Sequence, residues 1–293
     1  MTEDKASERR RLTSLAVGHV THDRLDDEIV PGGCAFYAAR TFEALGAKSR
    51  LITSLGSDFE CESALDKLEV RAQRAGKTTV FTNLYPESGA RIQYVDAVAG
   101  SIDPELLPGE WRNPDVIFIG PVICETDLED WKTTSGARLI AIGVQGFVRG
   151  VADQSDQANG ALRVVPRKWS PDRAMLNGVD IVFLSEEDLE GQGNLLQLLC
   201  DSIPIVALTR ERKGCDIIER GKKTWVGIHP AREVDPTGAG DTFAAGFLFA
   251  LAQGKNPIES AKLGAAAASI IIEGRSGENF SKLSEAFERA DKV

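Results

Sequence analysis

The sequence predicts an α/β fold, a doubly wound and mostly parallel sheet flanked by helices, with a small β flap beside it. Two observations predict it. Short apolar runs alternate with amphipathic stretches along most of the chain, and one region breaks this alternation with a hairpin pattern. Strand–helix alternation is typical of sheets whose crossover helices cover both faces. We expect residues 1–293 to form a single domain.

The expected strands are short, rich in β-branched residues and poor in polar ones, as is typical of strands buried on both faces. They lie at residues 14–20, 50–55, 116–119, 138–142, 181–184 and 205–208. Helix-like stretches are expected at residues 35–45, 62–74, 186–199 and 241–253.

The hairpin pattern lies in the first half of the chain. Residues 78–85 and 90–99 each read as a strand, and the turn residues 86–89 (PESG) join them. We expect residues 78–99 to form a flap beside the main sheet.

Composition and charge exclude several classes of function. The net charge is −10, which argues against nucleic acid as the main partner. No apolar run approaches the ~18 residues of a membrane-spanning helix, and the charged N-terminus does not resemble a signal peptide. The five scattered cysteines form no Cys-x-x-Cys pair, which fits a reducing compartment and no structural zinc. We therefore expect a cytoplasmic protein that binds neither membranes nor nucleic acid.

The strongest chemical signal is the segment 235–243 (DPTGAGDTF). Apolar residues at helical spacing come after it, so Gly238 and Gly240 open a helix. Bare backbone N–H groups and the dipole at a helix N-terminus favour a phosphate or a developing anion. Asp241 faces the same place and could accept a hydroxyl proton; the alternative is an acidic residue that only favours the dipole. Because the dipole favours the charged form, we expect Asp241 to be a weak base in the ground state.

A second segment, residues 31–46 (PGGCAFYAARTFEALG), opens another helix with two glycines. The backbone exposed at Gly32 and Gly33 could bind a polar substrate, or the glycines could form an ordinary tight turn. The segment 75–79 (AGKTT) looks like a phosphate-binding loop, but Arg71 stands where its first glycine should be. The residues before it also read as a helix rather than a strand, so we reject that loop.

The two glycine segments, in this order and at this distance, resemble the ribokinase-like carbohydrate kinases, also called the PfkB family. The segments 55–58 (LGSD), 185–188 (SEED) and 209–214 (TRERKG) are similar to the family's Gly-x-Asp turn, magnesium-organising motif and nucleotide-binding loop. The resemblance covers nearly the whole chain. It implies a kinase that moves the γ-phosphoryl group of ATP to a hydroxyl of a small sugar, polyol or cyclitol. Mg²⁺ is the implied metal, and a monovalent cation is left open.

The resemblance also implies roles for single residues. Asp241 is expected to be the catalytic base, and the N–H groups of Gly238, Ala239 and Gly240 the anion hole. Asp188 would serve the metal through water. The remaining implied residues bind substrate (Asp23, Gly33, Thr21, Tyr37 and Arg149) or line the nucleotide (Thr209, Gly214, Thr237 and Ser185).

Several positions depart from the family pattern. Ser185 and Asp188 stand where the family has Asn and Glu, and Glu211 stands where its nucleotide loop has glycine. Only nine positions separate Asp23 from Gly32, so the lid at about residues 24–31 is shortened and the hairpin 78–99 supplies the rest.

One branch of the family matches more closely. Tyr37, the short lid and the segments 78–85, 91–94 and 145–149 resemble the myo-inositol kinase-like proteins of plants and their bacterial relatives. Arg149 could present positive charge to phosphate or substrate, or form a surface salt bridge.

Two alternative functions remain open. One is a ribose or nucleoside kinase of the same family. The other is a catalytically silent nucleotide- or sugar-binding regulator on the kinase scaffold, which Ser185 and Glu211 favour and the intact Gly-Ala-Gly-Asp disfavours. With little exposed lid edge, we expect a monomer or a weak homodimer.

Overall fold

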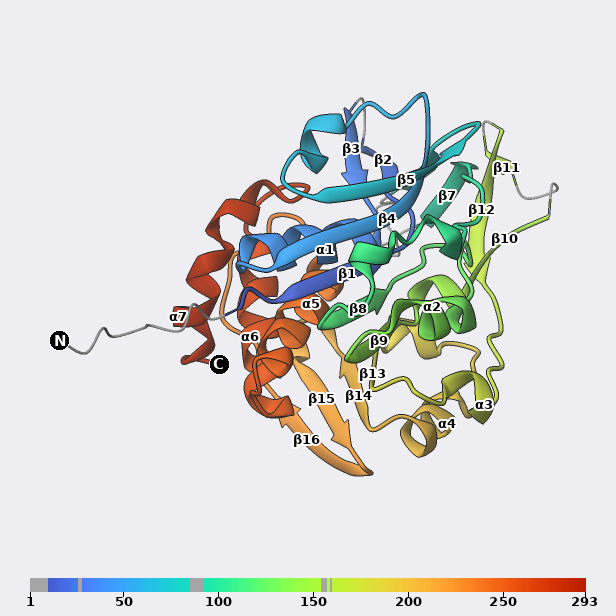
Figure 1. The fold of residues 1–293 in the computed structure, drawn as a ribbon. Helices are drawn as coiled ribbons and strands as arrows, with labels where there is room; N and C mark the ends of the chain where they lie inside the picture. Colours follow the sequence, from blue (N-terminus) through green and yellow to red (C-terminus); the bar gives the residue numbers. More distant parts are fainter. Residues whose placement is uncertain (1–9, 26–27, 85–91, 154–156, 159) are drawn as a thin grey trace.

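The computed structural model describes residues 10–25, 28–84, 92–153, 157–158 and 160–293. Among these residues, a nine-stranded main sheet has the order β16-β15-β14-β13-β9-β8-β1-β4-β5 (Figure 1). The seven strands from β14 to β5 run parallel to one another, and β15 and β16 run antiparallel at one edge. The strands are β1 (Thr13–Val17), β4 (Lys48–Gly56), β5 (Glu69–Ala75), β8 (Val116–Ile119), β9 (Leu139–Gly143), β13 (Ile181–Ser185), β14 (Ile205–Thr209), β15 (Cys215–Glu219) and β16 (Lys222–Val226).

Alternate residues of the main sheet enter two separate hydrophobic cores. On β8, Phe118 belongs to one core, whereas Ile117 and Ile119 belong to the other. One core is closed by α1 (Cys34–Ala44), α5 (Ala239–Ala252), α6 (Pro257–Ile271) and α7 (Ala286–Ala290). The other is closed by α2 (Leu128–Ser135), α3 (Arg173–Leu176) and α4 (Leu195–Ser202). The sheet is therefore covered on both faces, which confirms the doubly wound fold.

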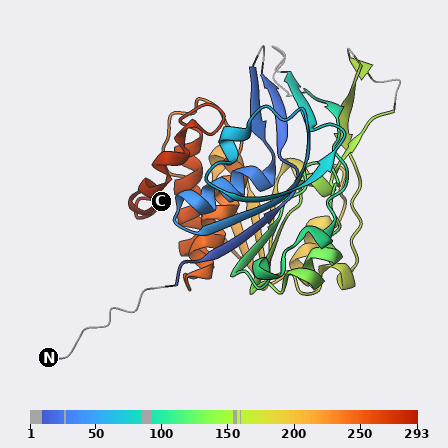
Figure 2. The same ribbon diagram turned by 45° about the horizontal axis from the view of Figure 1, so that its top comes forward.

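A second sheet stands beyond the carboxyl ends of the parallel strands (Figure 2). Its order is β10-β12-β7-β6-β2-β3, and β11 pairs with β12. It begins directly after the main sheet, because β1 ends at Val17 and β2 starts at Thr21. Its strands are β2 (Thr21–Leu25), β3 (Glu28–Gly32), β6 (Thr79–Leu84), β7 (Ile92–Ala97), β10 (Arg149–Val151), β11 (Gln157–Ala158) and β12 (Ala161–Pro166).

The second sheet is larger than the flap predicted from the sequence. The expected hairpin is present as β6 and β7, although its tip, residues 86–89, lies outside the described residues. The short lid segment forms a hairpin of β2 and β3. The predicted substrate residues Thr21 and Asp23 therefore lie inside strand β2. The strands between Arg149 and Pro166 were not predicted at all.

Two of the four expected helices differ in the structure. The stretch 62–74 is not a helix: a short 3-10 turn, Glu62–Leu65, leads into the edge strand β5. There Glu69 pairs with Lys48 and Arg50 of β4, and the Arg71 guanidinium lies over the ring of Trp111, so both side chains have partners in the strand. The stretch 186–199 is divided into a 3-10 turn, Glu187–Leu189, and α4.

The strand assignment of β5 changes one reason for rejecting the phosphate loop at residues 75–79. A strand, β5, does precede this segment. The next element is another strand, β6, rather than the helix whose N-terminus a phosphate loop requires. The loop is therefore still rejected, now because no helix follows it.

No helix in the part of the chain that the structure describes has the length and apolar character needed to cross a membrane.

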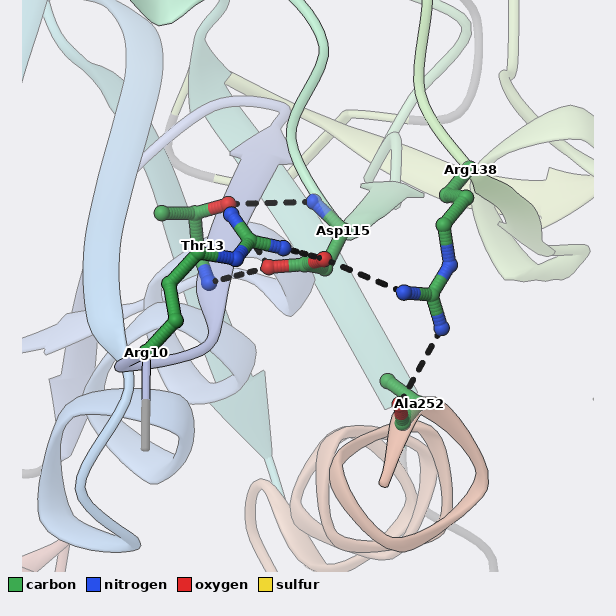
Figure 3. A network of polar contacts seen from close by, with 5 residues as sticks. All are labelled: Arg10, Thr13, Asp115, Arg138 and Ala252. Atoms are coloured by element: carbon green, nitrogen blue, oxygen red, sulfur yellow. Dashed lines mark hydrogen bonds and ion pairs between the residues drawn. The ribbon is translucent and has the colours of Figure 1, made fainter. Parts of the chain in front are cut away.

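A polar network lies at the amino end of the main sheet, where β1 begins at Thr13 and Asp115 directly precedes β8. Figure 3 shows its side chains. The buried carboxylate of Asp115 accepts hydrogen bonds from the backbone N–H and the hydroxyl of Thr13, at 2.9 and 3.0 Å, and pairs with Arg10. Arg138 lies 3.5 Å from the same carboxylate and donates to the carbonyl of Ala252 at the end of α5, at 3.2 Å. The network therefore ties β1, β8 and the last turn of α5 together.

Replacing Asp115 by asparagine should destabilise the fold by about 1–3 kcal/mol at neutral pH, because charged hydrogen bonds are lost inside the protein. Burial alone would raise the pKa of Asp115, but the Thr13 hydrogen bonds and Arg10 outweigh it and lower the pKa. A lowered pKa stabilises the fold above the unfolded-state value, and that contribution disappears as the pH falls through the folded-state value. Urea unfolding should show a difference between wild type and variant that shrinks toward pH 3. The exposed Asp201→Asn is the control and should stay within about 0.5 kcal/mol of wild type. A constant difference at every pH would contradict the linkage.

Candidate active site

Asp241 lies where the two sheets meet, in the first turn of α5. The thiol of Cys34, the first residue of α1, lies near enough to the Asp241 carboxylate to influence its pKa. The carboxylate also interacts with the charges of Arg149, Asp188 and Asp23. Arg149 comes from β10, Asp188 from the turn after β13, and Asp23 from β2. The fold thus brings together residues far apart in the sequence.

The environment of Asp241 corrects the expectation that it is a weak base. Burial is the largest effect and raises the pKa of Asp241 to about 6, together with the negative charges of Asp188 and Asp23. The Cys34 thiol and the positive charge of Arg149 lower the pKa of Asp241 but do not outweigh these effects. A carboxylate with this pKa is still ionised at pH 7 and is more basic than an ordinary aspartate. Desolvation thus outweighs the helix dipole on which that expectation relied.

Gly238, directly before α5, packs against the ring of Tyr37 in α1. Gly238 precedes α5 with φ 77°, and a Cβ there would lie 2.1 Å from the Tyr37 ring. The ring is 1% exposed, and its hydroxyl has no hydrogen-bond partner among the described residues. Burial, and then the nearby carboxylates of Asp23, Asp235 and Asp241, raise the pKa of the Tyr37 hydroxyl, so it stays protonated. An orphaned buried hydroxyl of this kind is suited to a ligand or a water molecule.

The backbone at the start of α5 differs in part from the expected anion hole. The N–H of Ala239 donates to the carbonyl of Pro236 at 3.1 Å and is therefore used within the turn. Gly240 and Asp241 come next in the first turn, where N–H groups lack intrahelical acceptors. Asp235 holds this turn in place: its carboxylate accepts the N–H of Thr237 at 2.9 Å and that of Ser276 at 3.0 Å.

The predicted substrate-binding residues on the second sheet lie close together. Thr21 donates its hydroxyl to the carboxylate of Asp23 at 2.7 Å. A Cβ at Gly32 would lie 2.4 Å from that carboxylate, so Asp23 covers the end of β3. Gly33 is the N-cap of α1 and has φ 102°. This positive φ favours glycine, so the turn by itself explains why a glycine stands here. Arg149 donates to the Gln93 side chain on β7, at 3.3 Å, within the same sheet.

The predicted nucleotide-binding residues form a second group at the ends of β13 and β14. Thr209 ends β14, and its carbonyl accepts the N–H of Glu186 at 3.2 Å. Gly214 closes the loop after β14 by accepting the N–H of Arg210 at 2.8 Å. Ser185 donates its N–H and its hydroxyl to the Asp188 carboxylate, at 2.7 and 2.9 Å. Ser185 and Asp188, which stand where the family has Asn and Glu, therefore hydrogen-bond to each other.

The donor set is compatible with magnesium held through water. Within the described residues, no group of three or more His, Cys, Asp or Glu side chains is placed to hold a metal ion directly. Mg²⁺ commonly keeps several waters and takes one or two carboxylates together with substrate phosphates. Asp188, whose Oδ2 is engaged by Ser185, would reach such an ion through its remaining oxygen or a water molecule.

Sequence reasoning missed two side chains of the site, Cys34 and Gln145. The amide of Gln145 lies 3.0 Å from Cys34 Sγ and also faces the Arg149 guanidinium. Cys34 comes directly after the twin glycines, but a lone cysteine carries no functional signal. Gln145 stands in a turn after β9, 111 residues from Cys34. Only the three-dimensional arrangement joins them.

Comparison with known proteins places the chain among phosphotransferases. The family described as pfkB family carbohydrate kinase matches residues 144–283. The chain is 44% identical to an inositol 3-kinase of Zea mays over 288 residues, covering 86% of this chain and 70% of that protein. It is 29% identical to a cytidine kinase of Thermococcus kodakarensis over 269 residues, covering 86% of this chain and 93% of that protein. A solved pyrophosphate-dependent kinase in the ribokinase family shares the fold, with TM-score 0.78, 22% identity and coverage of 93% of this chain and 99% of that one.

The likeness in sequence thus extends well beyond the matched family segment, and the architecture agrees with it. The protein belongs to the pfkB family of carbohydrate kinases, enzymes that transfer a phosphoryl group to an alcohol.

Proposed function

We propose that the protein transfers the γ-phosphoryl group of ATP to a hydroxyl of a small sugar, polyol or cyclitol. The position of Asp241 carries this proposal. It stands at the start of α5 and interacts with the charges of Asp23 on the second sheet and of Asp188 after β13. If Asp23 holds the acceptor and the loop Thr209–Gly214 holds the donor, the acceptor hydroxyl and the γ-phosphoryl group would meet near the Asp241 carboxylate.

In the proposed mechanism, Asp241 takes the proton of the attacking hydroxyl as its oxygen bonds to phosphorus. The free N–H groups in the first turn of α5 face the negative charge that develops on the transferred group. Asp23 and the Tyr37 hydroxyl orient the acceptor. Mg²⁺, when bound with the donor, would neutralise phosphate charge, with Asp188 in its outer shell.

We further propose that the second sheet is a lid over the acceptor. It supplies Asp23 and Arg149, and β2 and β10 bring these residues from opposite parts of the sheet. A monomer or weak homodimer remains our prediction for the assembly.

Relatives favour two variations on this function. A nucleoside acceptor follows from the cytidine kinase, and a cyclitol acceptor from the inositol 3-kinase. The pyrophosphate-dependent fold relative makes pyrophosphate a second candidate donor. The silent regulator is disfavoured, because Asp241 lies beside both proposed substrate groups with a pKa suited to proton transfer.

A screen of acceptors tests the function directly. Purified protein with Mg²⁺ is incubated with inositols, pentoses, hexoses or nucleosides, and ADP release from ATP or phosphate release from pyrophosphate is measured. Acceptor-dependent turnover with an inositol or sugar is the expected result. Turnover with nucleosides alone would favour the nucleoside kinase, and no turnover with any acceptor would favour the regulator.

Binding of the donor gives a prediction that does not depend on the acceptor. Calorimetry at saturating Mg²⁺ should show ATP binding in the low-millimolar range or tighter, roughly as for ordinary enzymes. Replacing the loop residue Gly214 by alanine should weaken this binding, because a Cβ would lie 2.3 Å from the carbonyl oxygen of Val226 and displace the loop. Gly221→Ala, at another positive φ with nothing within 4 Å, is the matched control. Absence of binding by ATP, ADP, GTP and pyrophosphate would contradict both the kinase and the nucleotide-binding regulator.

A further inference from the structure

A buried polar network lies at the junction between the main sheet and the second sheet. Its centre is His19, which is fully buried in the short crossover from β1 to β2. The ring Nε2 lies 3.0 Å from the carbonyl oxygen of Gly100, in the segment that leaves β7. Nδ1 lies 2.8 Å from the hydroxyl of Thr79, the first residue of β6, which is also fully buried. One side chain in the crossover to β2 thus contacts the chain at β6 and after β7.

The partners of the His19 ring determine which nitrogen carries the proton. A carbonyl oxygen can only accept, so Nε2 bears the hydrogen and donates it to Gly100. Nδ1 is then an acceptor and receives the hydroxyl proton of Thr79. The Thr79 oxygen in turn accepts the N–H of Ala99 at 2.9 Å. A neutral ring therefore satisfies every one of these bonds in a single tautomer and a single orientation.

Glu125 fixes the same junction from the main sheet. It lies in the loop after β8 and is 4% exposed. Its carboxylate accepts the backbone N–H groups of His19, Val122 and Ile123 at 2.8–2.9 Å. These charge-assisted bonds replace the water that a buried carboxylate loses. The carbonyl oxygen of Glu125 also accepts the N–H of Ile102 at 3.1 Å, so the residue ties both the crossover and the segment after β7 to the end of β8.

The backbone around the crossover leaves it little room to take another path. A Cβ added to Gly33, at the start of α1, would lie 2.2 Å from the carbonyl oxygen of His19. The N–H of Val20 donates to the hydroxyl of Thr53, on β4, at 2.8 Å. The crossover is therefore enclosed by the beginning of α1, by β4 and by the loop after β8.

We propose that the network of His19, Thr79 and Glu125 holds the second sheet in one position relative to the main sheet, and so positions the strand β2 that binds the acceptor. The inference rests on the proposed role of Asp23 in acceptor binding. Thr79 pairs with Thr21 in the register of β2 and β6, and the Thr21 hydroxyl donates to the Asp23 carboxylate. A displacement of the crossover or of β6 would therefore move that carboxylate. The three residues are positioning residues, because they act on the reaction through Asp23.

The hydroxyl of Thr79 is the part of the network that can be removed with the least disturbance. Thr79→Val keeps the branched shape, but it removes the donor to His19 and the acceptor of the Ala99 N–H. Amide hydrogen exchange without substrates should become about tenfold faster in β2 and in the segment after β7. Thr79→Ser supplies a hydroxyl again and should restore the protection. The matched control is Thr82→Val on the same strand, whose hydroxyl donates to Asp96 within the second sheet, and it should leave exchange in β2 unchanged.

A second readout without turnover observes the ring itself. The chain has three histidines, so a long-range proton–nitrogen NMR spectrum of the rings contains few signals. The wild type should show His19 with its proton on Nε2. The Nδ1 signal should shift in Thr79→Val and return in Thr79→Ser. A ring with its proton on Nδ1, or an Nδ1 signal that is the same in all three proteins, would contradict the network.

Glu125→Gln tests the contact from the main sheet. The amide keeps the size of the carboxylate, but its nitrogen cannot accept, so at least one of the backbone N–H groups loses its partner. Exchange in β2 should become faster than in wild type, as in Thr79→Val. Unchanged exchange in both variants would overturn the proposal, whatever their kinetics.

Kinetics connect the network to the proposed function. Thr79→Val should raise the KM for myo-inositol, or for the sugar that the acceptor screen identifies, by about tenfold and change the KM for the phosphoryl donor by less than about twofold. The donor is spared because the proposed donor loop follows β14 of the main sheet. If Asp23→Asn raised the acceptor KM and Thr79→Val did not, the positioning role alone would be refuted. If Asp23→Asn had no effect on that KM, the proposed acceptor site would fail, while exchange and the His19 spectrum would still decide whether the network fixes the second sheet.

Discussion

Asp241→Asn should lower turnover by roughly 10²–10⁴, the usual contribution of a positioned acid–base group. Asparagine keeps the size of the side chain but cannot accept the proton of the acceptor hydroxyl. ATP binding should stay the same or become tighter, because a negative charge near the phosphates is removed. Steady-state kinetics with the identified acceptor at saturating ATP, together with calorimetry, measure both effects.

The same variant should be more stable than wild type at neutral pH. The folded-state pKa of Asp241, about 6, lies above its ordinary value, so folding favours the protonated form. That contribution is complete below the unfolded-state pKa and is lost as the pH rises through about 6. At pH 7 to 8 the wild type therefore carries the cost of a buried charge, which asparagine avoids. Thermal unfolding should show a higher midpoint for the variant there and a smaller difference near pH 4.

The pH dependence of the wild type depends on the same group. Activity requires the ionised carboxylate, so kcat/KM should rise as the pH increases through about 6. Asp201→Asn, on the exposed end of α4, is the control and should change neither rate nor stability appreciably. If Asp241→Asn kept more than about a tenth of normal turnover, the catalytic assignment would be wrong.

The central sheet could be predicted from the sequence because its strands have a local signature. Buried parallel strands are short apolar runs, and the six that were expected form β1, β4, β8, β9, β13 and β14. The edge strand β5 lacked this signature. None of its residues is fully buried, and its charged residues at 69, 71 and 74 could equally satisfy a helical pattern until Lys48 and Arg50 of β4 pair with Glu69.

Most of the second sheet could not be predicted from local sequence patterns. β12 pairs with β7, which lies more than sixty residues earlier, and β10 has only three residues. Such strands are determined by their partners rather than by their own composition. The site has the same limitation. Gly238 and Asp241 could be identified from one helix-opening segment, whereas Gln145 meets Cys34 only once the fold brings the turn after β9 to the start of α1.

Electrostatics show a further limit of sequence reasoning. The helix dipole at Asp241 can be read from local sequence, and it predicts a lowered pKa. The larger effects depend on burial and on the carboxylates of Asp23 and Asp188, which come from other strands. The predicted direction of the Asp241 pKa shift was therefore wrong.

Gly240→Ala and Gly238→Ala should have opposite effects on the stability of the fold, although the two residues lie only two positions apart. Gly240 is exposed, has an ordinary φ and offers open space to an added Cβ, with nothing within 4 Å, so alanine should keep or raise stability by about 0.5–1 kcal/mol in this helical turn. Its methyl group would instead project where the transferred phosphoryl group is proposed to approach. Turnover should fall at least about tenfold, a fraction of the loss caused by removing a donor from an anion hole.

Gly238→Ala should damage the fold itself. The residue has φ 77°, and its Cβ would lie 2.1 Å from the buried Tyr37 ring, so the first turn of α5 or the ring must move. We expect a loss of about 1–3 kcal/mol in unfolding free energy, together with lower turnover. Thermal or urea unfolding without substrates, together with kinetics on the folded fraction, separates the two variants. The anion-binding role of the α5 N-terminus would be refuted if Gly240→Ala kept full turnover with a folded, stable protein. Loss of stability in Gly240→Ala but not in Gly238→Ala would show instead that the packing of Tyr37 against this turn has been misassigned.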